Sequence, residues 1–193
     1  MERCIATVAE TRFHGLTFLT DPGRVFTPRA TTERLVDAAL AWVGDDPARV
    51  ADVGTGSGAV AITLALRSPR IEVWASDTCS SALALARLNA DRLGAQVHCV
   101  KGDLLDGLPR DLDLIVANLP YLPVSPGYED EPPLAVFSDG DGLDHYRRLL
   151  AGAADHLADD GGLVIQLRGE ILEAERSELP WLRARLEGLV AAA

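Results

Sequence analysis

Residues 49–58 read Arg49-Val-Ala-Asp52-Val-Gly54-Thr-Gly56-Ser-Gly58, a short apolar run that ends in a glycine-rich turn. Residues 59–66 continue as an apolar helix-like run that Ser68-Pro69 ends. Glycines let the backbone turn sharply and approach a ligand without a Cβ clash. The helix that begins after the turn offers free N–H groups to an anion. The segment therefore predicts a strand–turn–helix unit that holds a cofactor, with a ligand-free glycine turn as the alternative.

Short apolar runs and longer helix-like runs alternate along the rest of the chain. Further strands are expected at residues 72–76, 96–100, 112–117 and 163–167, and further helices at 80–93 and about 143–157. Residues 112–117 are almost continuously apolar, as in a strand that is buried on both faces. Strands that are separated by helices imply parallel βαβ units. The sequence thus predicts an α/β fold with a doubly wound, mostly parallel sheet.

The 193 residues are expected to form a single domain in three parts. Residues 1–48 would add a hairpin and a helix, 49–168 would form the cofactor-binding core, and 169–193 would form a helical tail broken at Pro180. The tail shows no recognisable strand, so the C-terminal end of the fold reads as shortened. The sheet edge beyond the last expected strand would then need a second copy of the chain or a partner subunit to cover it.

Composition and charge exclude several classes of protein. Hydrophobic residues make up 48% and charged residues 24%, close to globular averages, which excludes a disordered or collagen-like chain. The 18 basic and 29 acidic residues give a net charge of −11, which disfavours broad binding to nucleic acids or anionic membranes. The sequence shows no apolar run of membrane-spanning length, no signal peptide, and no zinc-like or disulfide-like spacing among its cysteines. We expect a cytoplasmic protein without a metal site.

Asp77 follows the second expected strand, about 20 residues after the glycine turn, where an acidic residue can accept both hydroxyls of a ribose. This position suits S-adenosylmethionine or NAD. It disfavours NADP, because the extra phosphate would meet a negative charge. The alternative is an aspartate that only caps the helix beginning at Ser80.

Asn118-Leu-Pro-Tyr121 comes directly after the strand expected at 112–117, at the carboxyl edge where such sheets bind ligands. An enzyme that methylates a planar NH₂ group must hold both hydrogens, because the lone pair is delocalised into the π system. The Asn118 side-chain oxygen and a neighbouring backbone carbonyl can accept these hydrogens, and the Tyr121 ring can pack on the planar group. A dehydrogenase does not need this tetrapeptide, and an ordinary turn is the remaining alternative.

With these motifs in order, the chain resembles the class I S-adenosylmethionine-dependent methyltransferases. Within them it is similar to the HemK/PrmC type, which methylates the N5 of a glutamine in peptide release factors. The similarity covers about residues 13–168, and four stretches carry it: Val25–Glu33, Asp52–Gly58, Asn118–Pro123, and Glu131-Pro132 with Asp141–Arg148. They are similar to the family's V-x-x-P-R-P-x-T-E, its cofactor loop, its N-P-P-Y-x-P, and its E-P followed by D-G-L-D-x-Y-R-R.

The resemblance implies a Rossmann-like class I methyltransferase fold and direct in-line methyl transfer without a metal. It implies cofactor binding by Asp52, Gly54, Thr55, Gly56, Gly58, Asp77, Asp103 and Asn118. It implies catalytic roles for Asn118, Pro120 and Tyr121, and substrate contacts for Leu119, Tyr121 and Glu131. Leu119 stands where the family has proline; it keeps the backbone carbonyl but removes the fixed φ and adds an N–H.

Three functions remain open on the sequence. The favoured one is methylation of a glutamine side-chain amide in a protein such as a peptide release factor. The second is N6-methylation of adenine in RNA or DNA, because N-L-P-Y also occurs in ribosomal RNA adenine dimethyltransferases. The third is an inactive cofactor-binding partner subunit, which the short stretch before Pro28 and the unrecognised last strands favour.

Overall fold

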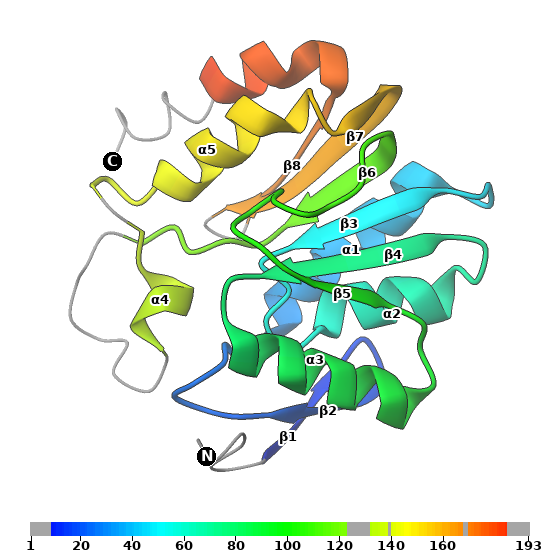
Figure 1. Cartoon of the computed structure of the whole chain (residues 1–193), viewed down its shortest axis with the longest axis vertical. Coiled ribbons are helices and arrows are strands. Elements are labelled where there is room, and N and C mark those ends of the chain that lie inside the picture. The colour runs from blue at the N-terminus through cyan, green and yellow to red at the C-terminus, as the bar shows by residue number, and fades with distance from the viewer. Residues whose placement is uncertain (1–8, 123–131, 139, 168–169, 185–193) are drawn as a thin grey trace.

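A computed structural model describes residues 9–122, 132–138, 140–167 and 170–184 of the chain. Its centre is a six-stranded sheet that is flanked by helices (Figure 1). The strands are β3 (Arg49–Val53), β4 (Glu72–Asp77), β5 (His98–Lys101), β6 (Leu112–Ala117), β7 (Leu157–Leu167) and β8 (Glu170–Glu175). The helices are α1 (Ala30–Val43), α2 (Ala59–Arg67), α3 (Ser80–Leu93), α4 (Pro133–Val136) and α5 (Asp144–Ala153).

The strand order is β5-β4-β3-β6-β7-β8, and every neighbouring pair is parallel except β7 with β8. The doubly wound, mostly parallel α/β sheet expected from the sequence is therefore confirmed. The chain runs outward from β3 to β5 and then returns to β6 on the other side of β3. Val53 pairs with both Ser76 and Ala117, so three strands end together where the order reverses. Such a switch point is where open α/β sheets bind ligands.

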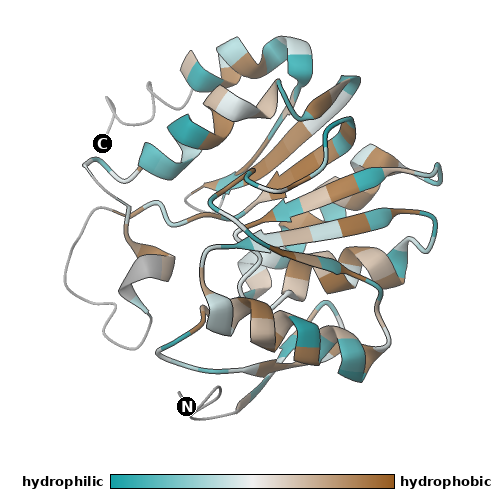
Figure 2. Ribbon diagram, in the orientation of Figure 1, coloured by the Kyte–Doolittle hydropathy of each residue, from teal (hydrophilic) through white to brown (hydrophobic). Residues whose placement is uncertain are grey.

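The sheet is apolar on both faces, as the hydropathy colouring of its strands shows (Figure 2). Successive residues of a strand point to opposite faces. Ile115 and Ile165 pack in the cluster that contains the buried side of α5, whereas Val116 and Val164 pack with α1 and α2. The two layers bury the sheet and leave its carboxyl edge to the connecting loops.

A hairpin of β1 (Ala9–Phe13) and β2 (Leu16–Thr20) precedes the sheet. The side chain of Asn89, which is fully buried on α3, ties it to the core. Its oxygen accepts the backbone N–H of Leu19, while its nitrogen donates to the carbonyls of Leu19 and Ser57. The hairpin is thereby joined to the loop that precedes α2.

The expectation that the tail contains no strand was wrong. Residues Glu170–Glu175 form β8, which pairs antiparallel with β7 and covers the edge that a second chain was expected to cover. The Glu-Ile-Leu-Glu-Ala-Glu segment consists of good helix formers, but its Leu172 and Ala174 alternate with exposed glutamates, which is a strand pattern. The glutamates also protect the outer edge of the sheet against pairing with another chain.

Two further boundaries differ from expectation. The helix expected to reach residue 157 ends at Ala153, and β7 begins at Leu157 rather than at residue 163. A register shift between Leu112 and Leu114 accommodates the early part of β7. Pro180 does not break a helix: it is the second residue of a helical stretch over 179–184, a position where proline is tolerated.

Leu172 provides a test of the β8 pairing. It is buried against the cluster around α5, so Leu172→Ala should lower the free energy of unfolding by about 2–5 kcal/mol. Glu173→Ala, at the next and exposed position, should change it by less than about 0.5 kcal/mol. Urea denaturation of the two variants measures the difference. Equal, small effects would contradict the placement of β8.

Candidate active site

A cavity of about 660 Å³ opens at the carboxyl edge of the sheet, within the about 300–1,000 Å³ that is usual for ligand sites. Most of the residues expected from the sequence line it: Asp52, Gly54, Thr55, Gly56, Asp77, Asp103, Asn118, Leu119, Pro120 and Tyr121. Gly58 does not line it, and Glu131 lies outside the described residues. The Val25–Glu33 stretch also lines the cavity, through Val25, Pro28 and Thr32.

The glycine turn requires its glycines for steric reasons. Gly54 has a φ of 74° and a Cβ there would lie 2.7 Å from a methyl group of Leu119. Gly58 has a φ of 82° and a Cβ would meet Ile62 at 2.8 Å and the backbone of Ala86 at 3.1 Å. Gly54 thus lets the glycine turn contact the loop after β6. Gly58 lets α2 pack closely on α3 behind the cavity.

Asp52 stabilises the glycine turn through two hydrogen bonds. It is 2% exposed, and its Oδ2 accepts hydrogen bonds from the Thr55 hydroxyl at 2.7 Å and from the Ala61 backbone N–H at 3.2 Å. Burial raises the pKa of Asp52 to about 6, against the two hydrogen bonds that lower it. The carboxylate therefore joins the end of β3, the turn and the first turn of α2.

Asp77 joins the turn to the start of α3. Its Oδ2 accepts the Gly56 N–H at 2.9 Å, and its Oδ1 accepts the Cys79 N–H at 2.8 Å. Burial raises the pKa of Asp77. A carboxylate offers about four lone-pair positions, so two bonds leave acceptor capacity for ligand hydroxyls. Capping and ribose binding, which the sequence set against each other, are compatible in this geometry.

Asp103 follows β5 and pairs with Arg148 of α5 at 2.5 Å. The preceding Gly102 is required by packing, because a Cβ there would lie 2.0 Å from the Asp106 carbonyl oxygen. The ion pair connects the loop after β5 to the D-G-L-D-x-Y-R-R segment.

Asn118 follows the last residue of β6. Its side-chain nitrogen donates to the Thr32 hydroxyl at 3.2 Å, which assigns the other side-chain atom, Oδ1, as an acceptor. Among the described residues no group donates to that oxygen. Thr32 lies in the first turn of α1, so α1 orients Asn118 toward the cavity.

Tyr146 supports the loop after β6 from outside the cavity lining; the sequence placed it within a motif but gave it no role. It is fully buried on α5, and its hydroxyl accepts the Leu119 N–H at 3.0 Å. The same hydroxyl lies 2.5 Å from the carbonyl oxygen of Gln166 and 3.2 Å from that of Leu119. Burial raises the pKa of Tyr146, so the hydroxyl keeps its proton. Gly142 packs against the loop as well: a Cβ there would lie 2.4 Å from the Tyr121 carbonyl oxygen.

The cavity is also lined by residues to which the sequence gave no role, among them Gln166 and His145. Gln166 lies near the end of β7, where its strand was identified only as apolar. His145 of α5 also lines the cavity, and its Nδ1 lies 2.8 Å from the Ser138 hydroxyl. Their positions in the sequence could have indicated both residues: Gln166 lies near the end of a parallel strand, and His145 lies within the 141–148 motif.

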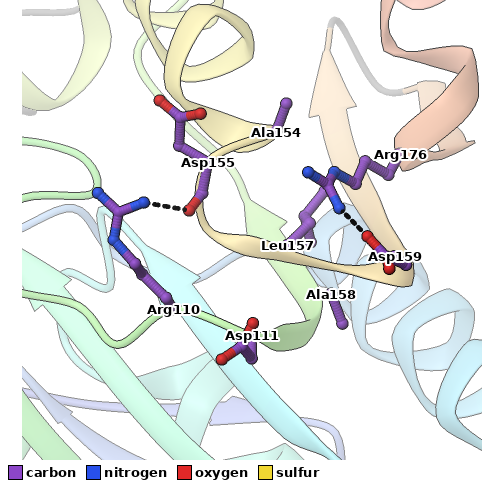
Figure 3. Close-up of a pocket in the computed structure, with 8 residues that line it drawn as sticks. All are labelled: Arg110, Asp111, Ala154, Asp155, Leu157, Ala158, Asp159 and Arg176. Carbon is purple, nitrogen blue, oxygen red and sulfur yellow. Dashed lines mark hydrogen bonds and ion pairs between the residues drawn. The ribbon is translucent and has the colours of Figure 1, made fainter.

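A second, polar hollow of about 400 Å³ lies at the opposite edge of the sheet, where β6 and β7 begin (Figure 3). Its two arginines already have partners: Arg110 donates to the Asp155 carbonyl at 3.0 Å, and Arg176 pairs with Asp159 at 2.5 Å. Within the described residues, no group of His, Cys, Asp and Glu side chains is arranged to hold a metal ion. None of the helices in those residues has the length and apolarity needed to cross a membrane.

Comparisons with known proteins agree with this geometry. Residues 17–127 match the family model described as methyltransferase small domain. A release factor glutamine methyltransferase of Bordetella pertussis is 40% identical over 80% of this chain and 61% of its own length. One from Streptococcus pneumoniae is 36% identical over 92% of this chain and 67% of its own. The chain spans about 60% of the length of the first relatives it matches.

Solved structures show the same fold. A ribosomal protein L11 methylase from Lactobacillus delbrueckii subsp. bulgaricus superimposes with a TM-score of 0.56 at 27% identity, over 75% of this chain and 63% of its own. A T. thermophilus 16S rRNA N2 G1207 methyltransferase, solved with AdoMet and guanosine, has a TM-score of 0.62 at 18% identity, over 82% of this chain and 41% of its own. Both likenesses confirm the methyltransferase-like sheet.

The raised pKa of Asp52 predicts a pH dependence of stability. Between the ordinary value of 3.8 and about 6, the folded chain binds this proton more tightly than the unfolded chain. The free energy of unfolding therefore falls as pH rises through that window, by on the order of 2–3 kcal/mol from this group. Asp52→Asn keeps an oxygen for Thr55 and Ala61 but has no proton to lose.

Urea unfolding at pH values from 4 to 7 should thus show Asp52→Asn gaining stability relative to the unsubstituted protein as pH rises. Other carboxylates titrate in both proteins and cancel in the difference. If the difference in the free energy of unfolding between the two proteins stayed constant from pH 4 to 7, the pKa of Asp52 would not be raised by folding.

Proposed function

The chain belongs to the methyltransferase small domain family and, within it, to the release factor glutamine methyltransferases; on this premise we propose that it methylates the side-chain amide of a glutamine in a peptide release factor, using S-adenosylmethionine. The observation that carries the proposal is the position of Asn118. The Asn118 side chain, whose Oδ1 receives no donor from the described residues, lines the same cavity as the glycine turn and Asp77. Groups suited to a cofactor and a group suited to orienting an amide would therefore share one site.

The residues present fit S-adenosylmethionine. The glycine turn opens onto the cavity at Gly56, where the nearest atom of the described residues to an added Cβ is a methyl group of Val25 at 3.9 Å, so a ligand can approach the backbone closely. Asp77 would accept the ribose hydroxyls, and Asp103 would lie beside the adenine. The bound cofactor supplies an electrophilic methyl group on a sulfonium.

The chain's contribution to the reaction is positional. S-adenosylmethionine, held by the glycine turn and Asp77, would supply the methyl group and leave as a neutral thioether, and the proton lost by the amide nitrogen would pass to solvent. Asn118 holds one hydrogen of the planar NH₂ group, which keeps the π face of the nitrogen toward the methyl group. Tyr121 would pack on the amide plane. Orientation of two reactants accounts for large rate enhancements without a covalent intermediate.

Methyl transfer from labelled cofactor to release factors, ribosomal RNA and total protein, compared side by side, tests the proposed substrate. Label in the release factor, at glutamine, is the expected result. Label in RNA alone would replace the proposal by adenine methylation. Cofactor binding without any transfer would favour a partner subunit.

Asn118→Ala should lower turnover in this assay by at least about a hundredfold, the scale observed when one positioned polar group is lost from a reaction site. Cofactor affinity should remain the same, because Asn118 orients the substrate. Calorimetry with S-adenosylmethionine is the control. A joint loss of cofactor affinity and turnover would place Asn118 in the cofactor site instead.

Asp77→Ala should weaken S-adenosylmethionine binding by about 1.5–3 kcal/mol, the range for hydrogen bonds to a charged group. Asp91→Ala, which removes an exposed carboxylate from the other end of α3, should leave the affinity unchanged. Isothermal titration calorimetry measures both, with NAD as a competing ligand that is expected not to bind. If Asp77→Ala bound S-adenosylmethionine with unchanged affinity, Asp77 would serve only to cap α3.

A further inference from the structure

Tyr146 places a hydroxyl against the loop after β6, outside the cavity lining. The residue is fully buried and reaches this loop from α5. Its hydroxyl oxygen lies 3.0 Å from the backbone nitrogen of Leu119, 3.2 Å from the Leu119 carbonyl oxygen and 2.5 Å from the Gln166 carbonyl oxygen. Backbone groups of the loop after β6 and of β7 therefore meet at one side-chain oxygen.

The hydrogen bonds of this oxygen can be assigned, because a tyrosine hydroxyl carries a single hydrogen. Burial raises the pKa of Tyr146, so that hydrogen stays on the oxygen. The Gln166 carbonyl at 2.5 Å is nearer than the Leu119 carbonyl at 3.2 Å and is the better acceptor for it. The lone pairs of the oxygen then accept the Leu119 N–H, and the hydroxyl ties the loop to the end of β7.

The residue at position 119 creates the need for this acceptor. Leu119 is 4% exposed, and a buried N–H without a partner opposes folding. Within the described residues, the Tyr146 hydroxyl is the acceptor that this N–H has. A proline at the same position would have a fixed φ and no N–H, so it would need no such acceptor.

The backbone of Leu119 sets the position of groups in the cavity. Asn118, the preceding residue, and Tyr121 both line the cavity. The Leu119 side chain covers Gly54 of the glycine turn, where an added Cβ would lie 2.7 Å from a leucine methyl group. A shift of Leu119 would therefore move the Asn118 side chain relative to the glycine turn. A misplacement of about 1 Å can cost about a hundredfold in rate.

We propose that Tyr146 is a positioning residue for the methyl transfer: its hydroxyl holds the Leu119 N–H and fixes the loop after β6 where a proline would fix it through φ. The inference rests on the proposed function, because it concerns the placement of Asn118 toward the substrate amide. It makes the requirement for the hydroxyl conditional on an N–H at position 119. Since Tyr146 lies outside the cavity lining, cofactor affinity does not depend on its hydroxyl.

Tyr146→Phe removes the hydroxyl and keeps the ring that fills the space against the loop. At a temperature well below unfolding, kcat with a release factor should fall at least about tenfold while the affinity for S-adenosylmethionine, measured by calorimetry, is unchanged. An unchanged kcat would overturn the proposal. So would an equal loss of cofactor affinity, which would indicate a general disturbance of the cavity.

Two backgrounds separate the N–H of residue 119 from its side chain. Made in a Leu119→Ala protein, Tyr146→Phe should again lower kcat at least about tenfold, because alanine keeps the N–H. Made in a Leu119→Pro protein, it should lower kcat less than about threefold, because proline has no N–H that could lose its partner. Equal losses in the two backgrounds would show that the hydroxyl acts through the Gln166 carbonyl instead, which would overturn the proposal.

Thermal unfolding follows the same contact without turnover. Tyr146→Phe should lower the unfolding midpoint of the Leu119→Ala protein by more than that of the Leu119→Pro protein, because only the former retains a buried N–H. If Leu119→Pro does not fold, amide hydrogen exchange replaces it: the Leu119 amide should exchange faster in Tyr146→Phe, and unchanged exchange would overturn the proposal. An unsubstituted protein that does not methylate release factors would count against the proposed function, while these two measurements still test the contact.

Discussion

The backbone N–H groups of Gly54 and Thr55 both donate to the carbonyl oxygen of Ser76, each at 2.9 Å. This pair of bonds fixes the glycine turn to the end of the neighbouring strand, and it depends on the left-handed conformation at Gly54. Once the turn is fixed, Asp77 can reach the Gly56 N–H, and Leu119 can lie against the bare Gly54 Cα. The glycine turn and the loop after β6, which both line the cavity, are thus built on one local contact.

The loop after β6 is fixed from the other direction, by α5. Leu119 has an N–H that the proline of related sequences lacks, and a free N–H at this buried position would be costly. The Tyr146 hydroxyl accepts it, and the same hydroxyl contacts carbonyl oxygens of both β7 and the loop. In the sequence, leucine at this position removes the fixed φ and adds an N–H. The structure shows that the added N–H becomes an anchor.

The alternation of apolar runs and helices was sufficient to predict the parallel order of the sheet, and the central runs β3 and β6 are buried on both faces as their composition indicates. The same rule failed for β8, because its glutamates and leucine have high helix propensity and its short alternating pattern is confirmed only by the pairing with β7. It also missed the start of β7, because Asp159, Asp160 and the following glycines are typical of a turn. The positions of Gln166 at the cavity and of Tyr146 against the loop after β6 depend on register and helix placement, which no local pattern encodes.

Polar burial in this chain is concentrated at the carboxyl edge. Asp52 is held there with a raised pKa, and Gln166 keeps an oxygen without a partner in the described residues, while the strands behind them are almost wholly apolar. Each of these groups opposes folding, and the two apolar clusters on either side of the sheet offset that cost. The apolar packing behind this edge is therefore what allows polar groups to be buried beside the cavity.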